Sequence, residues 1–157
     1  MKLYLETTMF NYYFDTERDG HADTVRLFEK IRAGEYEAYT SLYAVGELEE
    51  TEEPKRSKML SLIDEYNINV LPITDEANQL ASLYIAEKII PARFRLDGAQ
   101  IAISSIHGID YVLSYNFKHI NRAKTKLLTG RINSEKGYSN IVICTAKEVL
   151  DDENDEE

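Results

Sequence analysis

The sequence predicts an α/β fold in which helices cover both faces of a mostly parallel central sheet, giving three layers, α/β/α. Short apolar runs of strand length alternate along the chain with longer segments whose apolar residues recur at helical spacing. Polar residues directly follow the first and the fourth of these predicted strands. Ligands bind beyond the carboxyl ends of parallel strands, so we expect a functional site at that edge.

Length and composition indicate one domain, residues 1–150, because a chain of this length buries a substantial core without disulfides or a structural metal. The single cysteine, Cys144, has no internal partner for a disulfide, and no long apolar run resembles a signal peptide or a membrane span. We therefore expect a cytoplasmic protein with no membrane contact. Residues 151–157 hold six acids and no base, and we expect them to form a disordered acidic tail.

Charge is unevenly distributed along the chain. The formal net charge is −10, but residues 1–150 alone carry 18 Lys and Arg against 22 Asp and Glu. The segment from Lys118 to Lys136 has six basic residues and one acid. An acidic protein of this kind does not wrap long nucleic acid, whereas its basic segment suits a local phosphate contact. The alternative is an ordinary solvated helix face.

The first predicted strand, Lys2–Leu5, ends at a carboxylate, Glu6, and two hydroxyl residues. Aromatic residues follow at positions 10, 12, 13 and 14, and we interpret them as core or lid packing rather than as a platform for stacking bases. Helical spacing of apolar residues then predicts a helix over His21–Ala33, which Gly34 ends.

A second strand is predicted over Glu37–Thr40, and Ser41 is placed to cap the helix that follows. Glu47 lies on this helix away from its apolar stripe, and four further glutamates come soon after it. Pro54 breaks the helix. Glu47 is therefore either a site residue or one of several solvated surface acids.

The next predicted elements are a helix over Lys55–Tyr66 and a strand over Ile68–Ile73. Pro72 lies within that strand and favours an edge position in the sheet, because proline has no amide hydrogen to donate. Thr74 is placed to cap a further helix that runs to about Ile89.

The segment Leu96–Ile120 holds the helix and the strand around which we expect the site. Asp97 and Gln100 are placed to cap the first turn of its helix. Tyr111–Tyr115 is a short strand candidate, and Asn116 lies just past its end. We therefore expect Asp97 and Asn116 at one edge of the sheet.

Three more elements complete the predicted domain. They are a basic helix from about Asn121 to Leu128, a buried strand over Ile141–Cys144, and a last short helix from Thr145 through Leu150. The sequence shows no internal repeat and no linker between domains.

Four short motifs stand in an order that resembles one enzyme family. They are LETT at residues 5–8, SLYAVGEL at 41–48, LDGAQIAIS at 96–104 and YVLSYNFKHI at 111–120. In this order the chain resembles the PIN-domain family, metal-dependent ribonucleases that include VapC-like toxins of toxin–antitoxin pairs. Residues 132–150, INSEKGYSNIVICTAKEVL, are similar to the end of the subgroup whose fourth motif reads Trp-Asn-x-Lys-His, with Asn in place of the fourth acidic residue. The resemblance spans nearly the whole chain and implies a PIN-like domain.

The resemblance also implies a metal site for Mg²⁺ or Mn²⁺. Glu6, Glu47 and Asp97 match the three acidic ligands of the family. Thr8 matches a small polar residue that steadies the site, and Asn116 stands where many members have a fourth acid. Three carboxylates supply a charge of −3, so one divalent ion leaves −1 and a second would make the cluster positive. We therefore expect a single ion before substrate binds.

This chain departs from the family pattern at three positions. Glu6 replaces the commoner Asp, which moves the carboxylate outward by about 1.5 Å, one methylene. Mg²⁺ tolerates such a shift poorly because its octahedral geometry is strict. Gln100, which we expect to support the ligands as Thr8 does, stands where the subgroup often has His, and Tyr115 stands where it often has Trp.

These observations lead to the hypothesis of an endoribonuclease in which a metal-bound water attacks the phosphodiester bond of RNA. Asn116 is the candidate to orient water or substrate. Lys118, His119 and Arg122 are the candidates to hold phosphates beside the site. An antitoxin protein and a second copy of the chain are the candidate partners, with the aromatic residues of positions 4–14 or the helix after Thr74 as dimer surface.

Two other hypotheses stay open. Glu6 and the missing fourth acid also fit a PIN-like module that has lost catalysis and binds RNA or a protein partner. Without the resemblance, the chain is a small α/β domain that binds a phosphorylated ligand, although no Gly-rich phosphate loop supports this. Taken singly, Asp97 fits a helix cap and Asn116 a turn residue.

Overall fold

A parallel sheet forms the centre of residues 1–155, the part of the chain that the computed structural model describes. Its strands lie in the order β3-β2-β1-β4-β5, and every neighbouring pair in it is parallel. They are β1 (Lys2–Leu5), β2 (Glu37–Ser41), β3 (Asn69–Leu71), β4 (Tyr111–Leu113) and β5 (Val142–Cys144). The predicted parallel sheet and the edge position of β3 are confirmed.

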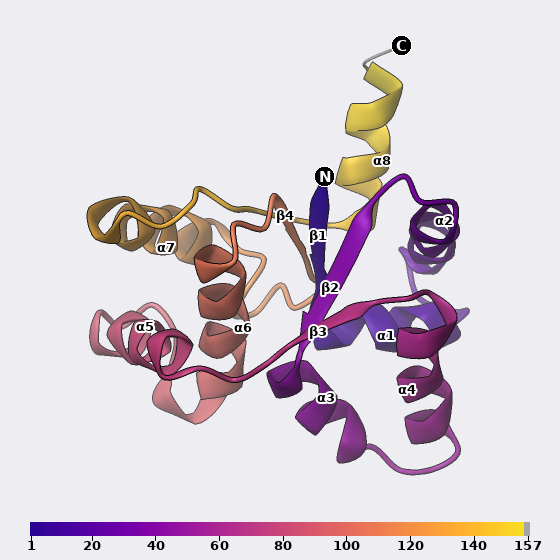
Figure 1. Cartoon of the computed structure of the whole chain (residues 1–157), viewed down its shortest axis with the longest axis horizontal. Coiled ribbons are helices and arrows are strands. Elements are labelled where there is room, and N and C mark those ends of the chain that lie inside the picture. Colours follow the sequence, from indigo (N-terminus) through magenta and orange to yellow (C-terminus); the bar gives the residue numbers. More distant parts are fainter. Residues whose placement is uncertain (156–157) are drawn as a thin grey trace.

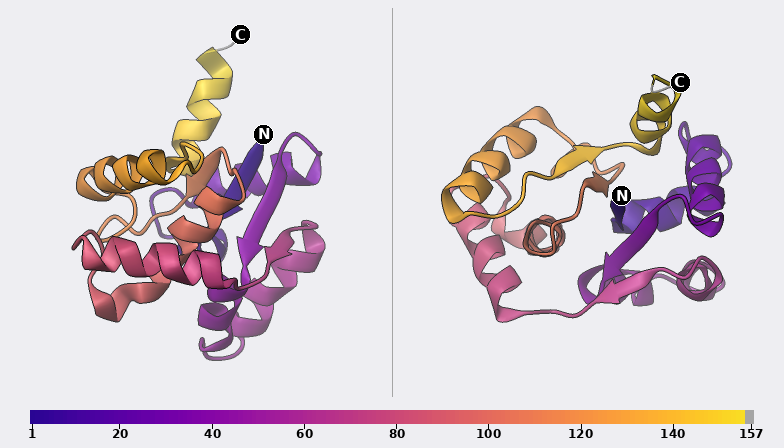
Figure 2. Two further views of the ribbon diagram at one scale, coloured as in Figure 1. Left: turned by 60° about the vertical axis from the view of Figure 1, so that its left-hand side comes forward. Right: turned by 45° about the horizontal axis from the view of Figure 1, so that its top comes forward.

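Helices cover both faces of the sheet, which confirms the three-layer architecture (Figures 1 and 2). One face carries α1 (Thr7–Phe14), α2 (His21–Arg32), α4 (Lys55–Glu65) and α8 (Ala146–Asp155). The other carries α5 (Asp75–Ala86), α6 (Arg95–Ile106) and α7 (Ala123–Lys136). The remaining helix, α3 (Leu42–Glu49), follows β2 directly and contributes to both cores. None of the helices in residues 1–155 combines the length and apolarity that crossing a bilayer requires.

Alternation along the strands builds a separate apolar core on each face. Leu3 and Leu5 of β1 pack with Leu113 of β4 against the α1–α2 side, whereas Tyr4 and Val112 pack against the α5–α6 side. This follows from the period of two in a strand, which sends successive side chains to opposite faces. Leu3, Tyr4 and Leu5 are all wholly buried, so β1 lies at the centre of the fold.

The order of the strands places β1 at the point where the chain reverses direction across the sheet. The chain goes outward from β1 through β2 to β3, and then crosses back over α5 and α6 to β4 on the other side of β1. Such a switch point opens a crevice beyond the carboxyl ends of the strands. The amide of Glu6 donates to the carbonyl of Leu113 at 3.1 Å, so the ends of β1 and β4 are joined there.

Helix α1 is an element that the sequence analysis did not predict. It begins two residues after the end of β1, and its threonines and aromatic residues favour strands by propensity. Glu6 supplies the N-cap, since its side chain accepts from the amide of Thr8. Tyr4 and Phe10 are wholly buried, so these two cannot contribute to the predicted dimer surface, whereas Tyr12, Tyr13 and Phe14 are only partly buried.

Two helices on the other face also differ from the predictions. Helix α6 begins at Arg95 after a 3₁₀ turn, Ala92–Phe94, and has no side-chain cap within the described residues. The predicted capping role of Asp97 and Gln100 is therefore wrong. Helix α7 runs to Lys136, eight residues beyond the predicted Leu128, because its buried face is largely polar and lacks a clear apolar period. That face includes Thr125, Thr129 and Asn133.

The last helix extends past its predicted end. Helix α8 continues through Asp155, so residues 151–155 are helical rather than part of a disordered tail. Two ion pairs fasten this part: Lys147 Nζ lies 2.5 Å from Asp151, and Lys30 Nζ lies 3.0 Å from Glu153. The prediction for residues 156 and 157 lies outside the described residues.

We expect Leu3→Ala to lower the free energy of unfolding by about 2–5 kcal/mol, because Leu3 is wholly buried on the central strand and its loss leaves a cavity. Leu127→Ala is the matched control, since Leu127 is 56% exposed on α7, and should change stability by less than about 0.5 kcal/mol. Urea denaturation followed by circular dichroism measures both. Equal stability of the two variants would contradict the described core.

Candidate functional site

The carboxyl edge of the sheet brings together polar residues that are far apart in the sequence. Glu6 follows β1, and Asn116 comes three residues after β4, the neighbouring strand. Glu47 lies on α3, which begins where β2 ends, and Asp97 lies in the first turn of α6. Burial is the largest cause of the raised pKa of Glu6 and of Glu47, and the negative charge of Asp97 raises both further. Asp97 is therefore near enough to both glutamates to influence them.

Glu6 is buried and held by neutral hydrogen-bond donors. Its Oε1 accepts from the amide of Thr8 at 3.1 Å, from Thr8 Oγ1 at 2.5 Å and from Ser114 Oγ at 2.7 Å. All three bonds reach the same oxygen, so Oε2 accepts none from the described residues. Burial raises the pKa of Glu6 to about 7, although these hydrogen bonds lower it.

Glu47 is half-buried and is held by Gln100. Gln100 Nε2 donates to Glu47 Oε1 at 2.9 Å, and Thr7 Oγ1 donates to the same oxygen at 3.2 Å. The other end of the Gln100 amide accepts from the hydroxyl of Tyr4 at 2.9 Å, which in turn is hydrogen-bonded with Ser41. Burial, followed by the charge of Asp97, raises the pKa of Glu47. Gln100 is wholly buried, so a continuous hydrogen-bonded chain fixes Glu47 to the core.

Asp97 is buried beside an imidazole. His119 Nδ1 lies 3.3 Å from Asp97 Oδ2, and the ring of Phe94 covers His119 at a centroid distance of 4.0 Å. Burial raises the pKa of Asp97, while the side chains of Asn116 and His119 lower it. Asn116 Oδ1 accepts from the amide of His119 at 3.1 Å, so Asn116 fixes the turn that carries the imidazole.

Ser114 is a site residue that the sequence analysis missed. Its hydroxyl donates to Glu6 and accepts from the amide of Asn116 at 2.9 Å, which joins the first and fourth motifs. Thr8 makes a second connection, because its Oγ1 accepts from the amide of Tyr115 at 2.8 Å. A lone hydroxyl at the end of an otherwise apolar strand run, Tyr-Val-Leu-Ser, was the available signal.

The basic residues predicted to hold phosphates have different environments. Lys118 is exposed, whereas His119 is buried against Asp97. Arg122 Nη2 donates to the carbonyl of Ile89 at 2.7 Å, and its Nε donates to Thr125 Oγ1 at 2.8 Å. The structure therefore engages His119 and Arg122 within the fold and leaves Lys118 open to solvent.

The donor chemistry at this edge fits a hard divalent cation, since carboxylate oxygens are the ligands that Mg²⁺ and Mn²⁺ prefer. Burial is the largest cause of the raised pKa of all three acids, and a cation beside them would favour their charged forms. In the conformation described for residues 1–155, however, no three His, Cys, Asp or Glu side chains are close enough together to hold one ion. The acids form an electrostatic cluster whose ligand geometry is not closed.

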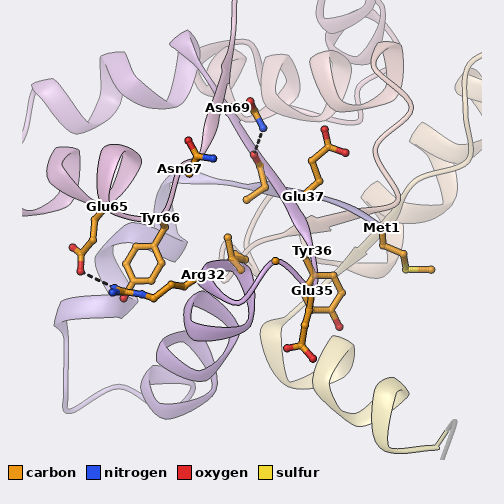
Figure 3. A pocket seen from close by; sticks show the side chains of 12 residues that line it. Met1, Arg32, Glu35, Tyr36, Glu37, Glu65, Tyr66, Asn67 and Asn69 are labelled. Atoms are coloured by element: carbon orange, nitrogen blue, oxygen red, sulfur yellow. Dashed lines mark hydrogen bonds and ion pairs between the residues drawn. The ribbon is translucent and has the colours of Figure 1, made fainter.

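A hollow of about 500 Å³ lies at the opposite, amino edge of the sheet (Figure 3). There Arg32 is paired with Glu65 at 2.9 Å and lies over the ring of Tyr66 at 4.5 Å. Asn69 Nδ2 donates to the carbonyl of Ala38 at 3.0 Å. Arg32, Glu65 and Asn69 are thus engaged within the fold, and none of the predicted site residues lines this hollow.

Comparison with known proteins identifies the fold. The chain is similar to the Mycobacterium tuberculosis toxin VapC20, a sarcin–ricin loop cleaving toxin, with 12% identity, 88% of this chain and 98% of the other covered, and a TM-score of 0.53. It is also similar to a chain of the Rickettsia felis VapBC2 complex, solved with a DNA fragment from its promoter, with 11% identity, 92% and 98% coverage, and a TM-score of 0.54. No protein-family model matches the chain, and no curated protein matches it in sequence. The PIN-like fold of the VapC toxins is therefore shown.

We expect Glu6→Gln to change how stability depends on pH. The folded state binds the Glu6 proton more tightly than the unfolded state, whose pKa is near 4.5. Folding therefore takes up a proton between pH 4.5 and about 7, and the wild type loses stability as pH rises through this range. The free energy of unfolding of Glu6→Gln, taken relative to that of wild type, should therefore rise by about 3 kcal/mol between pH 4.5 and 8.

Urea denaturation in EDTA at several pH values measures this difference. Glu49→Gln, which alters an exposed glutamate on α3, controls for the loss of one negative charge. If the difference in free energy of unfolding between Glu6→Gln and wild type stays constant over this pH range, the raised pKa of the buried Glu6 is contradicted.

Proposed function

We propose that this protein is a metal-dependent endoribonuclease of the VapC toxin type, acting in the cytoplasm, in which Asn116 takes the place of the fourth acid. The observation that carries the proposal is the hydrogen-bonded link between the elements that bear the three acids. Thr7, which follows Glu6, and Gln100, which lies on the same helix as Asp97, both donate to Glu47 Oε1. Structured RNA is the proposed substrate, an antitoxin the proposed protein partner, and a second copy of the chain a further one.

Glu6, Glu47 and Asp97 would hold one Mg²⁺ or Mn²⁺ ion, which supplies an activated water as nucleophile and neutralises charge on the phosphate. The remaining residues prepare these ligands. Ser114 and Thr8 hold one oxygen of Glu6 and leave the other unengaged. Neutral donors of this kind fix a ligand's orientation without cancelling its charge.

Two further interactions orient the other ligands. Gln100 Nε2 fixes Glu47, and the imidazole of His119 holds Asp97 at 3.3 Å. Burial of His119 under Phe94 keeps that imidazole in place. Asn116, which follows β4, and the exposed Lys118 would position the substrate. Orienting the reacting groups in this way is a major source of rate enhancement in enzymes.

We expect the purified protein with Mn²⁺ to cleave tRNA or an RNA hairpin of the sarcin–ricin loop, and Glu47→Gln and Asp97→Asn to lose at least about 100-fold in rate, because each removes a metal ligand. Glu49→Gln is the matched control for Glu47→Gln, since both glutamates lie on α3 and Glu49 is exposed. Gel analysis of end-labelled RNA measures the rates. Cleavage that is absent, or equal in Asp97→Asn, would sink the proposal.

A second candidate function is a PIN-like module that binds RNA or a protein without cleaving. The open ligand geometry and the three donors already bound to Glu6 Oε1 favour it. Titration calorimetry with Mn²⁺ separates the two functions. The nuclease requires a heat of binding that Asp97→Asn loses, whereas the module requires RNA or partner affinity with no Mn²⁺ heat.

A further inference from the structure

A second hollow, of about 480 Å³, is lined by residues of α1, α2, α8 and the segment after β4. Three aromatic side chains, Tyr12, Tyr115 and Phe117, line it together with charged residues of both signs. The proposed ribonuclease chemistry uses none of these rings. The volume is in the range of sites that take small molecules or single nucleotides.

Two of the rings form a rigid floor. The rings of Tyr12 and Tyr115 stack at a centroid distance of 3.9 Å and an angle of 6°. The hydroxyl of Tyr115 is hydrogen-bonded with Thr24 Oγ1 at 2.8 Å and donates to the carbonyl of Gly20 at 3.2 Å. Gly20 has φ +96°, and a Cβ there would lie 3.0 Å from the Tyr115 ring. The sequence therefore allows the chain to close tightly around this tyrosine.

The third ring is exposed. Phe117 is 56% exposed and lies 6.3 Å from Tyr115 between centroids, at 65° to it. A single exposed apolar residue needs no explanation, but this one contacts the ring of Tyr115, lines the hollow and follows Asn116 directly. Its exposed ring is available to a flat ligand.

Charged groups surround the rings. The cations are Arg18 and Lys147, whose side chains are 60% and 68% exposed and pair with Asp15 and Asp151. Exposed pairs of this kind are weak, so both cations can exchange a carboxylate for a phosphate, and Arg18 also lies 5.5 Å from the centroid of the Tyr12 ring. Three acids in the lining, Glu17, Asp19 and Asp23, are hydrogen-bond acceptors for amino groups.

The hollow is joined to the carboxylates through the backbone. The amide of Tyr115 donates to Thr8 Oγ1, and that hydroxyl donates to Glu6. A ligand on the aromatic rings would thus contact Tyr115 and Phe117, the residues on either side of Asn116.

We propose that this hollow binds an unpaired nucleobase of the RNA, next to the nucleotide whose phosphate meets the carboxylates. The base stacks on Phe117, its amino group donates to Asp19 or Asp23, and Arg18 or Lys147 contacts a neighbouring phosphate. Proteins recognise single-stranded RNA by this combination of aromatic stacking and flanking cations. The inference rests on the proposed function for its choice of RNA, and it assigns the hollow as the place where one base binds.

The test uses a pentanucleotide, U-U-(2-aminopurine)-U-U, in EDTA, so that neither metal nor cleavage enters the measurement. Stacking of 2-aminopurine on a ring quenches its fluorescence. We expect the wild type to bind and quench the probe, and Phe117→Leu to bind it at least about fivefold more weakly, the lower end of the contribution of one stacked base. The control is Leu127→Ala, an exposed apolar residue of equal exposure on α7, which should behave as wild type.

A pentanucleotide with an abasic centre completes the experiment. We expect it to bind wild type as weakly as the 2-aminopurine probe binds Phe117→Leu. Equal binding of the two probes, or no loss in Phe117→Leu, would overturn the inference and leave the hollow to a protein segment. If the protein binds the probe in a base-dependent way but cleaves no RNA, the inference is supported and the proposed ribonuclease activity is contradicted.

Discussion

The burial of Glu6 between the ends of β1 and β4 is the constraint on which the rest of the site depends. A carboxylate removed from water is costly unless hydrogen bonds replace its hydration. Ser114 and Thr8 supply those bonds, and both residues are themselves tied to the backbone that follows β4. The same contacts thus lessen the cost of the buried acid and set the distance between the first and fourth motifs. The raised pKa of Glu6 shows that the compensation is incomplete.

Much of the fold follows from local sequence rules. The parallel sheet was predictable from strand-length apolar runs alternating with helices, and the caps Ser41 and Thr74 accept the expected amide bonds from Ala44 and Ala77. Helix α1 was not predictable in this way, because its residues favour strands and its cap is the buried Glu6. The length of α7 was missed for another reason. Its buried Asn133 accepts a hydrogen bond from the Tyr84 hydroxyl at 2.5 Å. Tertiary hydrogen bonds of this kind replace the apolar stripe from which a helix is predicted.

The candidate site divides in the same way. Spacing alone does not single out Glu6, Glu47 and Asp97 among 28 acids; the order of motifs in a resembling family does. The structure adds the hydrogen bonds that link their elements, from Thr7 and Gln100 to Glu47, which no local pattern contains. The structure also adds a contact for His119. The sequence places this residue in a basic segment, whereas in the fold it is buried against Asp97. Such contacts join residues of separate elements, so they follow from the topology and not from neighbouring residues.

The hydrogen-bond partners of Glu6, Glu47 and Asp97 indicate whether these acids have a structural or a functional role. Within residues 1–155, no Lys or Arg forms an ion pair with Glu6, Glu47 or Asp97; their described partners are hydroxyls, amides and one imidazole. A purely structural cluster would gain most from an arginine, which neutralises and bridges carboxylates. Neutral donors instead fix the acids while leaving their charge uncompensated. The proposed metal ion requires this arrangement, since a cation that bound only the folded chain would recover that energy as stability.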